Sequence, residues 1–501
     1  MSNFTASPPG TPSARSLFKN ILQGTSLYSL AFFVPTVASI LLVPVTTRCL
    51  SVSDYGVTDL LTQVSAVLST LLGSNFSGAL GYFYFAAEPG EARCRVVDTV
   101  VLGAALLGAA ASIICWPFLS LLSRLVFPGI PAEPYLRVIV ALMVPAFVVE
   151  SLVSWLRVVG RPGLFFAASM IRLGVMICGI LVLVGLLGWR VWGVVTTSAA
   201  SIVITVCFLL VLWLRGRVPT FNKHLFVKML KFSLPLSIGM LAMFVLNFGD
   251  RFILPHYRPF NDLGIYALAY KVGMLMSTLY GSFQVYWSAQ VFQIMQRDDS
   301  ERIFPRILTY VVLTISFCAL ALTVCSGPII RGLANPAYAS AAAVVPILVL
   351  AYYFRAIGDF LRCLFLVAGR PGYDAICNWI GAVVCLGGYA LLIPKYGIWG
   401  AAIATALAFA VISIISAVWS YRVRPYRVES RRLAKIGMAV ALAIVPYCFL
   451  RTLSLPGQIG MAVLSLALFP VALWFLRFLT PGELQASLDL LARLRPTSRL
   501  A

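Results

Sequence analysis

The sequence predicts an all-α integral membrane protein with about fourteen transmembrane helices, arranged as two parallel six-helix repeats followed by two extra C-terminal helices. Three observations carry this prediction. The composition is too apolar for a soluble protein, apolar runs of membrane-spanning length follow one another along the chain, and the second half repeats the first at a nearly constant offset.

Composition alone places the chain in a lipid bilayer. Of the 501 residues, 60% are apolar and only 11% are charged, and the mean hydropathy is strongly positive. A hydrocarbon core about 30 Å thick needs roughly 20 mostly apolar residues per crossing, so a chain of this length has room for more than a dozen. Almost nothing is left for a soluble domain.

Apolar runs of spanning length, each ended by charge, glycine or proline, define the predicted spans. The first six are 20–46, 57–85, 97–122, 134–156, 163–187 and 192–214, the next six are 232–255, 263–294, 305–330, 340–368, 372–393 and 398–420, and the last two are 436–450 and 457–479.

These spans divide the chain into segments. An N-lobe over 20–214 and a C-lobe over 232–420 are joined by a basic cytoplasmic linker, 215–231. A second basic cytoplasmic linker, 421–435, leads to the last two spans within 436–479. A flexible cytoplasmic tail is predicted over 1–19, and 480–501 is predicted to form an amphipathic helix at the membrane surface, with Leu484, Leu488 and Leu491 on one face.

The distribution of positive charge predicts the orientation. Short cytoplasmic loops carry an excess of Lys and Arg, and placing the N-terminus inside puts twenty-five of the thirty-eight on the cytoplasmic side and eight outside. The remaining five lie within predicted spans. Both termini are therefore predicted to be cytoplasmic, in the inner membrane of the cell.

Several function classes are disfavoured by what the sequence contains. The net charge of +21 follows from topology and attraction to anionic lipids, so we expect no nucleic-acid partner. Eleven scattered cysteines and two histidines, without a CxxC pair, predict neither a metal site nor a disulfide framework. No nucleotide-binding or hydrolase motif accompanies a soluble domain, so we expect neither an enzyme nor a cofactor.

An internal repeat spans both lobes with a period near 208 residues. The register barely drifts over six spans, and because each copy holds an even number of spans, the two copies enter the membrane in the same direction. The matching segments are Asp54-x-Gly56 with Asp262-x-Gly264, Ser69-Thr70-Leu71 with Ser277-Thr278-Leu279, Val158–Gly163 with Val367–Gly372, and Trp192-Gly193 with Trp399-Gly400. Parallel repeats are typical of transporters with a substrate site between two halves.

The chain also resembles a known family, the oligosaccharide and O-antigen flippases (Wzx-like, polysaccharide transporter family) of the MOP superfamily. The resemblance covers nearly the whole chain. It is carried by Gly24, Leu41–Pro44, Leu50-Ser51, Asp54–Gly56, Asp250–Leu254, Leu263–Tyr266 and Ala269–Lys271, together with the spans and the repeat.

This resemblance implies a MOP/MATE-like V-shaped transporter that moves a polyprenyl-pyrophosphate-linked oligosaccharide from the inner to the outer leaflet for surface polysaccharide synthesis. The implied partners are the lipid-linked oligosaccharide, membrane lipids, and a glycan polymerase and glycosyltransferases. Three alternatives stay open: a lipid II flippase, a MATE-type multidrug or cation antiporter, and a nontransporting scaffold for glycan-assembly enzymes.

Charged residues within the predicted spans are the candidate site residues, because each is costly when it faces lipid. Away from the ends of the spans, five positive charges exceed three negative ones, which suits an anionic lipid head. The spacing of four and three residues places Arg355, Asp359 and Arg362 on one helical face. The candidate cationic cleft is Arg172, Arg251, Lys271, Arg355 and Arg362, and the candidate ion-coupling or ion-pair acids are Glu150, Asp250 and Asp359.

Other interpretations of these residues stay open. Asp359 is also in a position to neutralise an arginine of its own helix. Asp250 and Arg251 are near enough to a span end to lie in the headgroup layer, and Lys271 is near enough to one to extend to the interface. Tyr266, Tyr270 and Tyr280 are candidates for stacking on sugar rings or for packing in the core. Two energy sources are equally compatible with the sequence, the membrane potential and ion antiport through one of the acids.

Overall fold

The computed structural model describes Ser39 and residues 41–70, 75–215, 218–297, 299–447 and 454–478. Within these residues the regular secondary structure is helical throughout, without strands, as the sequence predicts. The predicted tail 1–19, most of the first span and the predicted surface helix in 480–501 lie outside the described residues. The described helices form two compact units that divide inside one helix, between Leu241 and Ala242.

Nine helices of the described part are long and apolar enough to cross a membrane, and one bent pair brings the number to ten. These ten coincide with ten of the fourteen predicted spans. Of the other four, the run 57–85 is divided by the undescribed residues 71–74, and the run 263–294 is two helices that meet at Met274. The runs 20–46 and 436–450 are only partly described, so a count of fourteen is not confirmed.

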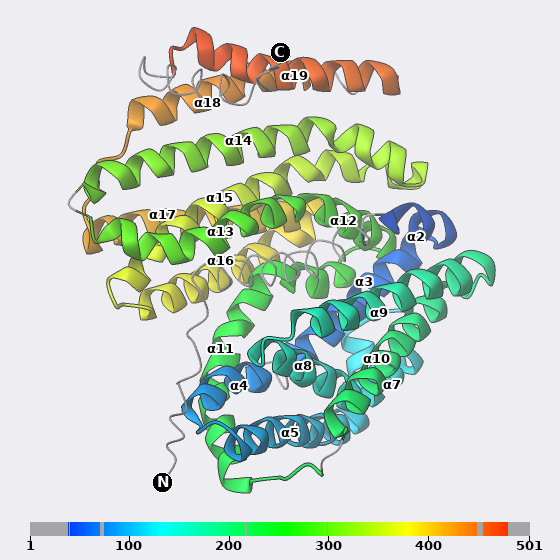
Figure 1. Cartoon of the computed structure of the whole chain (residues 1–501). Coiled ribbons are helices and arrows are strands. Elements are labelled where there is room, and N and C mark those ends of the chain that lie inside the picture. Colours follow the sequence, from blue (N-terminus) through cyan, green and yellow to red (C-terminus); the bar gives the residue numbers. More distant parts are fainter. Residues whose placement is uncertain are drawn as a thin grey trace, which may run out of the picture. The chain divides into compact units, whose positions relative to one another are not determined.

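Unit 1 is built around helices α5, α8 and α10. Helix α5 packs against α4 and α8, and α10 packs against α8 and α9 (Figure 1). Helices α7 and α8 form the bent pair, with an angle of 43° between them. The elements are α2 (Val43–Cys49), α3 (Val52–Ser69), α4 (Asn75–Ala86), α5 (Glu91–Cys115), η2 (Trp116–Phe118), α6 (Leu119–Val126), α7 (Glu133–Ala141), α8 (Met143–Val158), α9 (Pro162–Gly179), η3 (Ile180–Leu186), α10 (Arg190–Leu214) and the first part of α11 (Lys223–Ile253).

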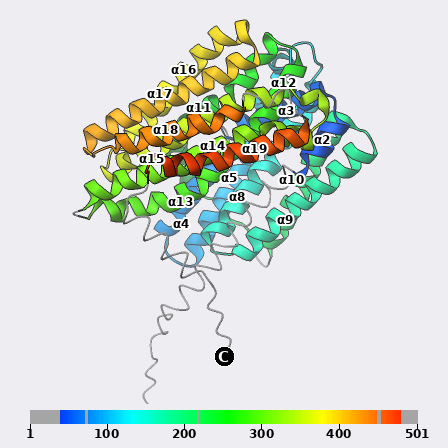
Figure 2. The same ribbon diagram turned by 90° about the horizontal axis from the view of Figure 1, so that it is seen from above.

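Unit 2 is built around α15, which packs against α12, α13, α14, α16 and α17. Helices α14 to α17 run side by side in both views (Figures 1 and 2). The elements after α11 are η4 (Leu254–His256), α12 (Phe260–Gly273), α13 (Leu275–Met295), α14 (Ser300–Leu333), η5 (Pro336–Tyr338), α15 (Ala341–Val367), α16 (Gly372–Tyr396), α17 (Ile398–Val423), α18 (Ser430–Ile444) and α19 (Leu455–Phe475).

The two C-terminal helices α18 and α19 pack on each other and on α14. Their contact is made mostly of small and apolar side chains, including Ala439, Ala443 and Ala462 against Leu320 and Val324. Small residues allow close helix packing in a membrane, where apolar burial alone gives little driving force. The predicted last two spans are therefore an addition to the second repeat that packs on one of its helices.

The internal repeat is visible in the helix order. Helices α3, α5, α9 and α10 begin at Val52, Glu91, Pro162 and Arg190, and α12, α14, α16 and α17 begin 208 to 210 residues later. The same succession of long helices thus occurs twice. This agrees with the predicted architecture of two parallel repeats.

The repeated Gly-Arg-Pro motif ends a helix and starts the next in both units. Gly160 and Gly369 have φ of +70° and +66°, a region that favours glycine. The following amides, those of Arg161 and Arg370, donate to carbonyls five residues back at 2.9 and 2.8 Å, which caps the helix ends. Pro162 is then the first residue of α9 and Pro371 the N-cap residue of α16, positions where the missing N–H costs nothing.

We expect Gly369→Ala to lower the free energy of unfolding by about 1 kcal/mol, because a non-glycine residue is strained in the left-handed region. An added Cβ would meet no atom within 4 Å, so the cost comes from the backbone alone. Gly163→Ala, also in open space but inside a helix, is the matched control. Denaturant unfolding in mixed micelles measures both, and equal midpoints would contradict the assigned cap.

Candidate functional site

Helix α15 carries the three charged side chains that the sequence places on one helical face. Asp359 lies between the two arginines, with its Oδ2 3.6 Å from Arg355 Nε and its Oδ1 paired with Arg362 Nη2. The spacing of four and three residues therefore produces one continuous contact, as expected for a helix. These side chains are mostly covered, with 18% of Arg355 and 10% of Arg362 exposed.

Helix α16 supplies partners for Arg362 that were not among the predicted site residues. Arg362 Nη1 lies 3.2 Å from Asp374 Oδ1 and donates to Asn378 Oδ1 at 2.5 Å. Asp374 stands in the first turn of α16, directly after the repeated Gly-Arg-Pro motif. Arg362 thus lies between two carboxylates, one from its own helix and one from the next.

A second polar cluster joins the end of α11 to α12. Tyr266 Oη donates to Asp250 Oδ2 at 2.5 Å, and the Arg251 backbone N–H donates to Asp250 Oδ1 at 2.8 Å. Tyr270 Oη donates to the Asn247 carbonyl at 2.5 Å, and the Arg251 guanidinium lies 4.2 Å from the Tyr270 ring centre. Asp250 and Arg251 are 0% and 2% exposed, so they lie inside the unit and not at its surface.

One hydrogen bond connects the two clusters. Arg355 Nη1 donates to Asn247 Oδ1, which links the α11 cluster to the charged face of α15. The resulting network crosses α11, α12, α15 and α16 and contains equal numbers of opposite charges. Its charged members are Asp250, Asp359 and Asp374 with Arg251, Arg355 and Arg362. Such balance is what burial requires, because a lone buried charge costs several kcal/mol.

The three candidate tyrosines are packed in the core of unit 2. Tyr266 and Tyr270 are fully buried, with ring centres 5.7 Å apart, and Tyr270 also contacts Tyr352. Tyr280 donates to Gln284 Oε1, and Gln284 in turn donates to the Asp359 carbonyl at 3.4 Å. In this structure their hydroxyls and rings support the charged network.

Unit 1 holds a separate ion pair. Arg172 Nη1 of α9 lies 3.7 Å from Glu150 Oε1 of α8, and the two side chains are 53% and 43% exposed. The structure thus joins two residues that were predicted independently as a cleft arginine and an acid. Lys271 of α12 is half-buried in unit 2. Within the described residues, no group of three or more His, Cys, Asp or Glu side chains could hold a metal ion.

The fold is similar to that of solved membrane transporters. Solved structures similar to it include the lipid II flippase MurJ in an inward closed conformation, with a TM-score of 0.73, 17% identity and coverage of 90% of this chain and 99% of that one. A MATE family multidrug resistance transporter in an inward-facing conformation gives a TM-score of 0.61, 17% identity and coverage of 80% and 98%. At these identities the likeness concerns the fold.

The chain belongs to the polysaccharide biosynthesis protein family, whose model matches residues 21–286. Among curated proteins, an uncharacterised membrane protein of Methanocaldococcus jannaschii is 23% identical over 241 residues. That match covers 46% of this chain and 47% of the archaeal protein, so the chain spans less than half the length of this relative. The family assignment agrees with the resemblance found in the sequence.

Proposed function

We propose that the protein flips a polyprenyl-pyrophosphate-linked oligosaccharide from the inner to the outer leaflet of the cytoplasmic membrane by alternating access. The observation that carries this proposal is membership of the polysaccharide biosynthesis protein family in a chain with the fold of membrane transporters. Its product would serve O-antigen, capsule or exopolysaccharide assembly, with a glycan polymerase and glycosyltransferases as partners. Both termini would be cytoplasmic.

Arg172 is the proposed first contact for the pyrophosphate. It is about half exposed, and within the described part of the chain its carboxylate contact, with Glu150, is long at 3.7 Å, so an anionic head competes for it at low cost. Arg355, Arg362, Arg251 and Lys271 are the further proposed cationic residues. Arg355 and Arg362 share Asp359, so a pyrophosphate reaches them only by displacing that carboxylate.

Asp359 is the proposed link between energy and substrate. A proton or cation that neutralises this carboxylate weakens its hold on both arginines and leaves them free for an anion. Glu150 stands in the same relation to Arg172, and Asp250, which accepts a hydrogen bond from Tyr266, is the third proposed ion-coupling acid. The membrane potential is the other proposed source, at about 2.3 kcal/mol per charge per 100 mV.

Deletion of the gene tests the proposed function in cells. We expect surface polysaccharide to be lost and lipid-linked oligosaccharide to accumulate in the membrane, both restored by the wild-type gene. The second candidate is a lipid II flippase, favoured by the fold shared over 90% of the chain. Accumulation of lipid II with normal surface polysaccharide would support that candidate and contradict ours.

We expect Arg172→Ala to lower the amount of surface polysaccharide about tenfold or more, because the variant loses one charge-assisted contact to the pyrophosphate head. The protein level in the membrane should not fall, because the side chain is half exposed. Arg137→Ala removes a comparably exposed arginine, paired with Glu133, and should leave polysaccharide unchanged. Equal polysaccharide in both variants would remove Arg172 from the site.

A further inference from the structure

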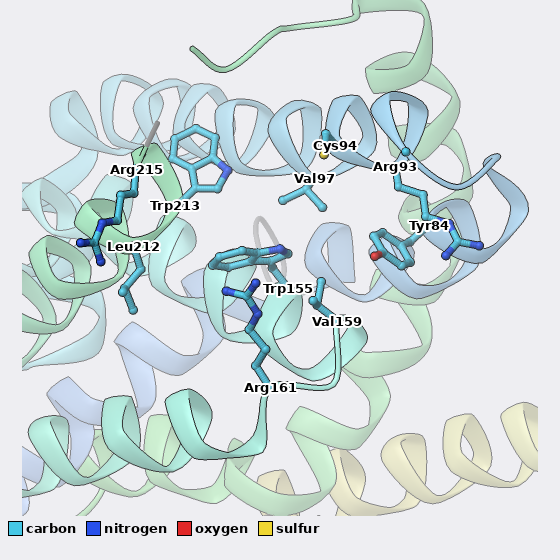
Figure 3. Close-up of a pocket in the computed structure, with 11 residues that line it drawn as sticks. Tyr84, Arg93, Cys94, Val97, Trp155, Val159, Arg161, Leu212, Trp213 and Arg215 are labelled. Atoms are coloured by element: carbon cyan, nitrogen blue, oxygen red, sulfur yellow. The ribbon is translucent and has the colours of Figure 1, made fainter. Parts of the chain in front are cut away.

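A cavity of about 500 Å³ lies in unit 1 among the ends of several helices. Arg93 enters it from the first turn of α5, Arg161 from the connection between α8 and α9, and Arg215 from the residue after α10. Tyr84, Trp155 and Trp213 add aromatic walls. Figure 3 shows Arg215 and Trp213 on one side, Arg93 and Tyr84 on the other, and Trp155 with Arg161 between them.

The three arginines of this cavity differ from those of the charged network in unit 2. Among the described residues, Arg93, Arg161 and Arg215 have no carboxylate within ion-pair distance, whereas Arg355 and Arg362 do. Arg93 instead donates to the Ala87 carbonyl at 3.2 Å. Among the described residues that line the cavity, none is acidic. Three positive charges with no anion among them favour an anionic ligand.

The aromatic walls are fixed by contacts behind them. Trp213 Nε1 donates to Asp98 Oδ1 at 3.1 Å, and the Thr220 backbone N–H donates to the other carboxylate oxygen at 3.2 Å. Asp98 is 3% exposed, so this carboxylate lies behind the indole. Trp155 is 8% exposed, and the Arg161 guanidinium lies 6.0 Å from its ring centre. The rings therefore form preformed flat surfaces beside the positive charges.

The place of the cavity in the fold points to the headgroup layer. It is lined by residues at the ends of membrane-spanning helices, where the chain leaves the hydrocarbon. Tryptophan, tyrosine and arginine together are typical of this layer. Arginine binds phosphate oxygens through paired N–H donors, and a volume of about 500 Å³ is within the range of small-molecule sites.

We propose that this cavity binds the phosphorylated headgroup of a membrane lipid. Arg161 and Arg215, with Arg93, hold the phosphate oxygens, and the sugar or glycerol part lies against Trp155 and Trp213. Two lipids share this chemistry, the polyprenyl pyrophosphate of the proposed substrate and a resident anionic phospholipid. With the polyprenyl pyrophosphate as occupant, the cavity would be a loading site for the substrate on the predicted cytoplasmic side. That version of the inference rests on the proposed function.

The repeat provides an internal comparison. At an offset of 209 residues, the positions of the three arginines are again arginines, namely Arg302, Arg370 and Arg424. The position of Trp155 is Leu364, which is buried in unit 2. The second repeat thus keeps the positive charges, which suit any cytoplasmic loop, and lacks this aromatic wall. Arg370 is accordingly a matched control for Arg161.

The test uses Cys94, an exposed thiol that lines the cavity. Full-length protein in phosphatidylcholine nanodiscs is alkylated with N-ethylmaleimide, and mass spectrometry follows the peptide that contains Cys94. Cys49, an exposed thiol of α2, is followed in the same samples as a control. Four samples are compared: phosphatidylcholine alone, with phosphatidylglycerol, with polyprenyl pyrophosphate, and with inorganic pyrophosphate in solution.

We expect one or both phosphorylated lipids to slow the alkylation of Cys94 about tenfold when present at about ten times the dissociation constant, with Cys49 unaffected. The lipid that protects Cys94 more strongly is identified as the occupant of the cavity. Arg161→Gln and Arg215→Gln should each abolish this protection. Arg370→Gln should retain it, as should Arg95→Gln, which removes a charge paired with Glu91.

Three outcomes would overturn the proposal. They are equal Cys94 rates in all lipids, protection that survives both arginine substitutions, and equal protection by inorganic pyrophosphate, which would assign the cavity to a soluble phosphate. These rates are measured without transport. A protein that fails to flip oligosaccharide but is protected by phosphatidylglycerol would refute the proposed function and leave the site intact.

Discussion

Arg362→Met is expected to lower the free energy of unfolding by about 3 kcal/mol, because it leaves the mostly buried Asp359 carboxylate without this cation, whereas Asp374 is 44% exposed and solvent screens its charge. Arg362 is 10% exposed and pairs with both Asp359 and Asp374. Methionine keeps much of the side-chain volume, so the loss reports charge and not a cavity. Denaturant unfolding of the purified protein in mixed micelles, followed by loss of helix signal, measures it.

Two further variants make the Arg362 result specific. Arg297→Met removes an arginine of the same unit whose ion pair with Asp299 is exposed, and it should cost less than about 1 kcal/mol. Adding Asp359→Asn and Asp374→Asn to Arg362→Met should recover most of the lost stability, because both carboxylates that pair with Arg362 are then replaced by neutral amides. Equal losses for Arg362→Met and Arg297→Met would contradict the buried network.

Gly400→Ala is expected to be the most damaging of the glycine-to-alanine substitutions in the part of the chain that the structure describes, at about 3 kcal/mol or more. An added Cβ at this position would overlap the Leu392 carbonyl group and lie 2.9 Å from the Ile393 nitrogen. All of these are backbone atoms of α16, so no side-chain rotation relieves the clash. The expected result is a large fall in folded protein, measured by the monodisperse fraction in size-exclusion chromatography and by the unfolding midpoint.

Gly193, the repeat counterpart of Gly400, sets the scale for this result. An added Cβ there would lie 2.8 Å from Val184 Cγ2, a side-chain atom that can move, and 3.2 Å from the backbone of Leu183. Gly193→Ala should therefore cost less than Gly400→Ala. Gly387→Ala, with nothing within 4 Å, should be neutral or slightly stabilising. A Gly400→Ala protein as stable as Gly387→Ala would contradict the close packing of α16 and α17.

Helical periodicity and the internal repeat made part of this structure predictable. Hydropathy predicted the ten described elements that are long and apolar enough to span a membrane. The repeated Gly-Arg-Pro segment forms a helix cap, and the repeated Trp-Gly segment forms a close contact between helices. The contact among Arg355, Asp359 and Arg362 followed from spacing along one helix, where local geometry decides which side chains meet.

The remaining contacts depend on helix packing, which spacing along the chain does not fix. Asp374 lies near the start of the predicted span 372–393, and nothing local indicates that it faces Arg362 of the preceding helix. The same holds for the bond between Tyr266 and Asp250, which lie on different helices. Arg93, Arg161 and Arg215 were not among the predicted site residues. Their convergence on one cavity requires three helix ends to meet.

The predicted span 263–294 did not appear as a single long helix because a break and polar residues interrupt it. The run 263–294 is apolar on average, but α12 and α13 meet at Met274, and α13 carries Ser, Gln and Tyr side chains along its length. Two of these side chains are tied to the charged network, since Gln284 donates to the Asp359 carbonyl and Tyr280 donates to Gln284. Hydropathy averages over such positions, so it indicates the presence of a membrane segment better than its continuity.

Transport in proteoliposomes tests the central claim most directly. Purified protein is reconstituted with a polyprenyl-pyrophosphate-linked oligosaccharide in both leaflets, and membrane-impermeant periodate oxidises the sugars that reach the outside. We predict that wild-type protein brings the inner-leaflet sugars within reach of the reagent and that Arg172→Ala slows this step. Inner-leaflet sugars that stay protected as in protein-free liposomes, despite folded protein and an imposed membrane potential or ion gradient, would contradict the flippase account.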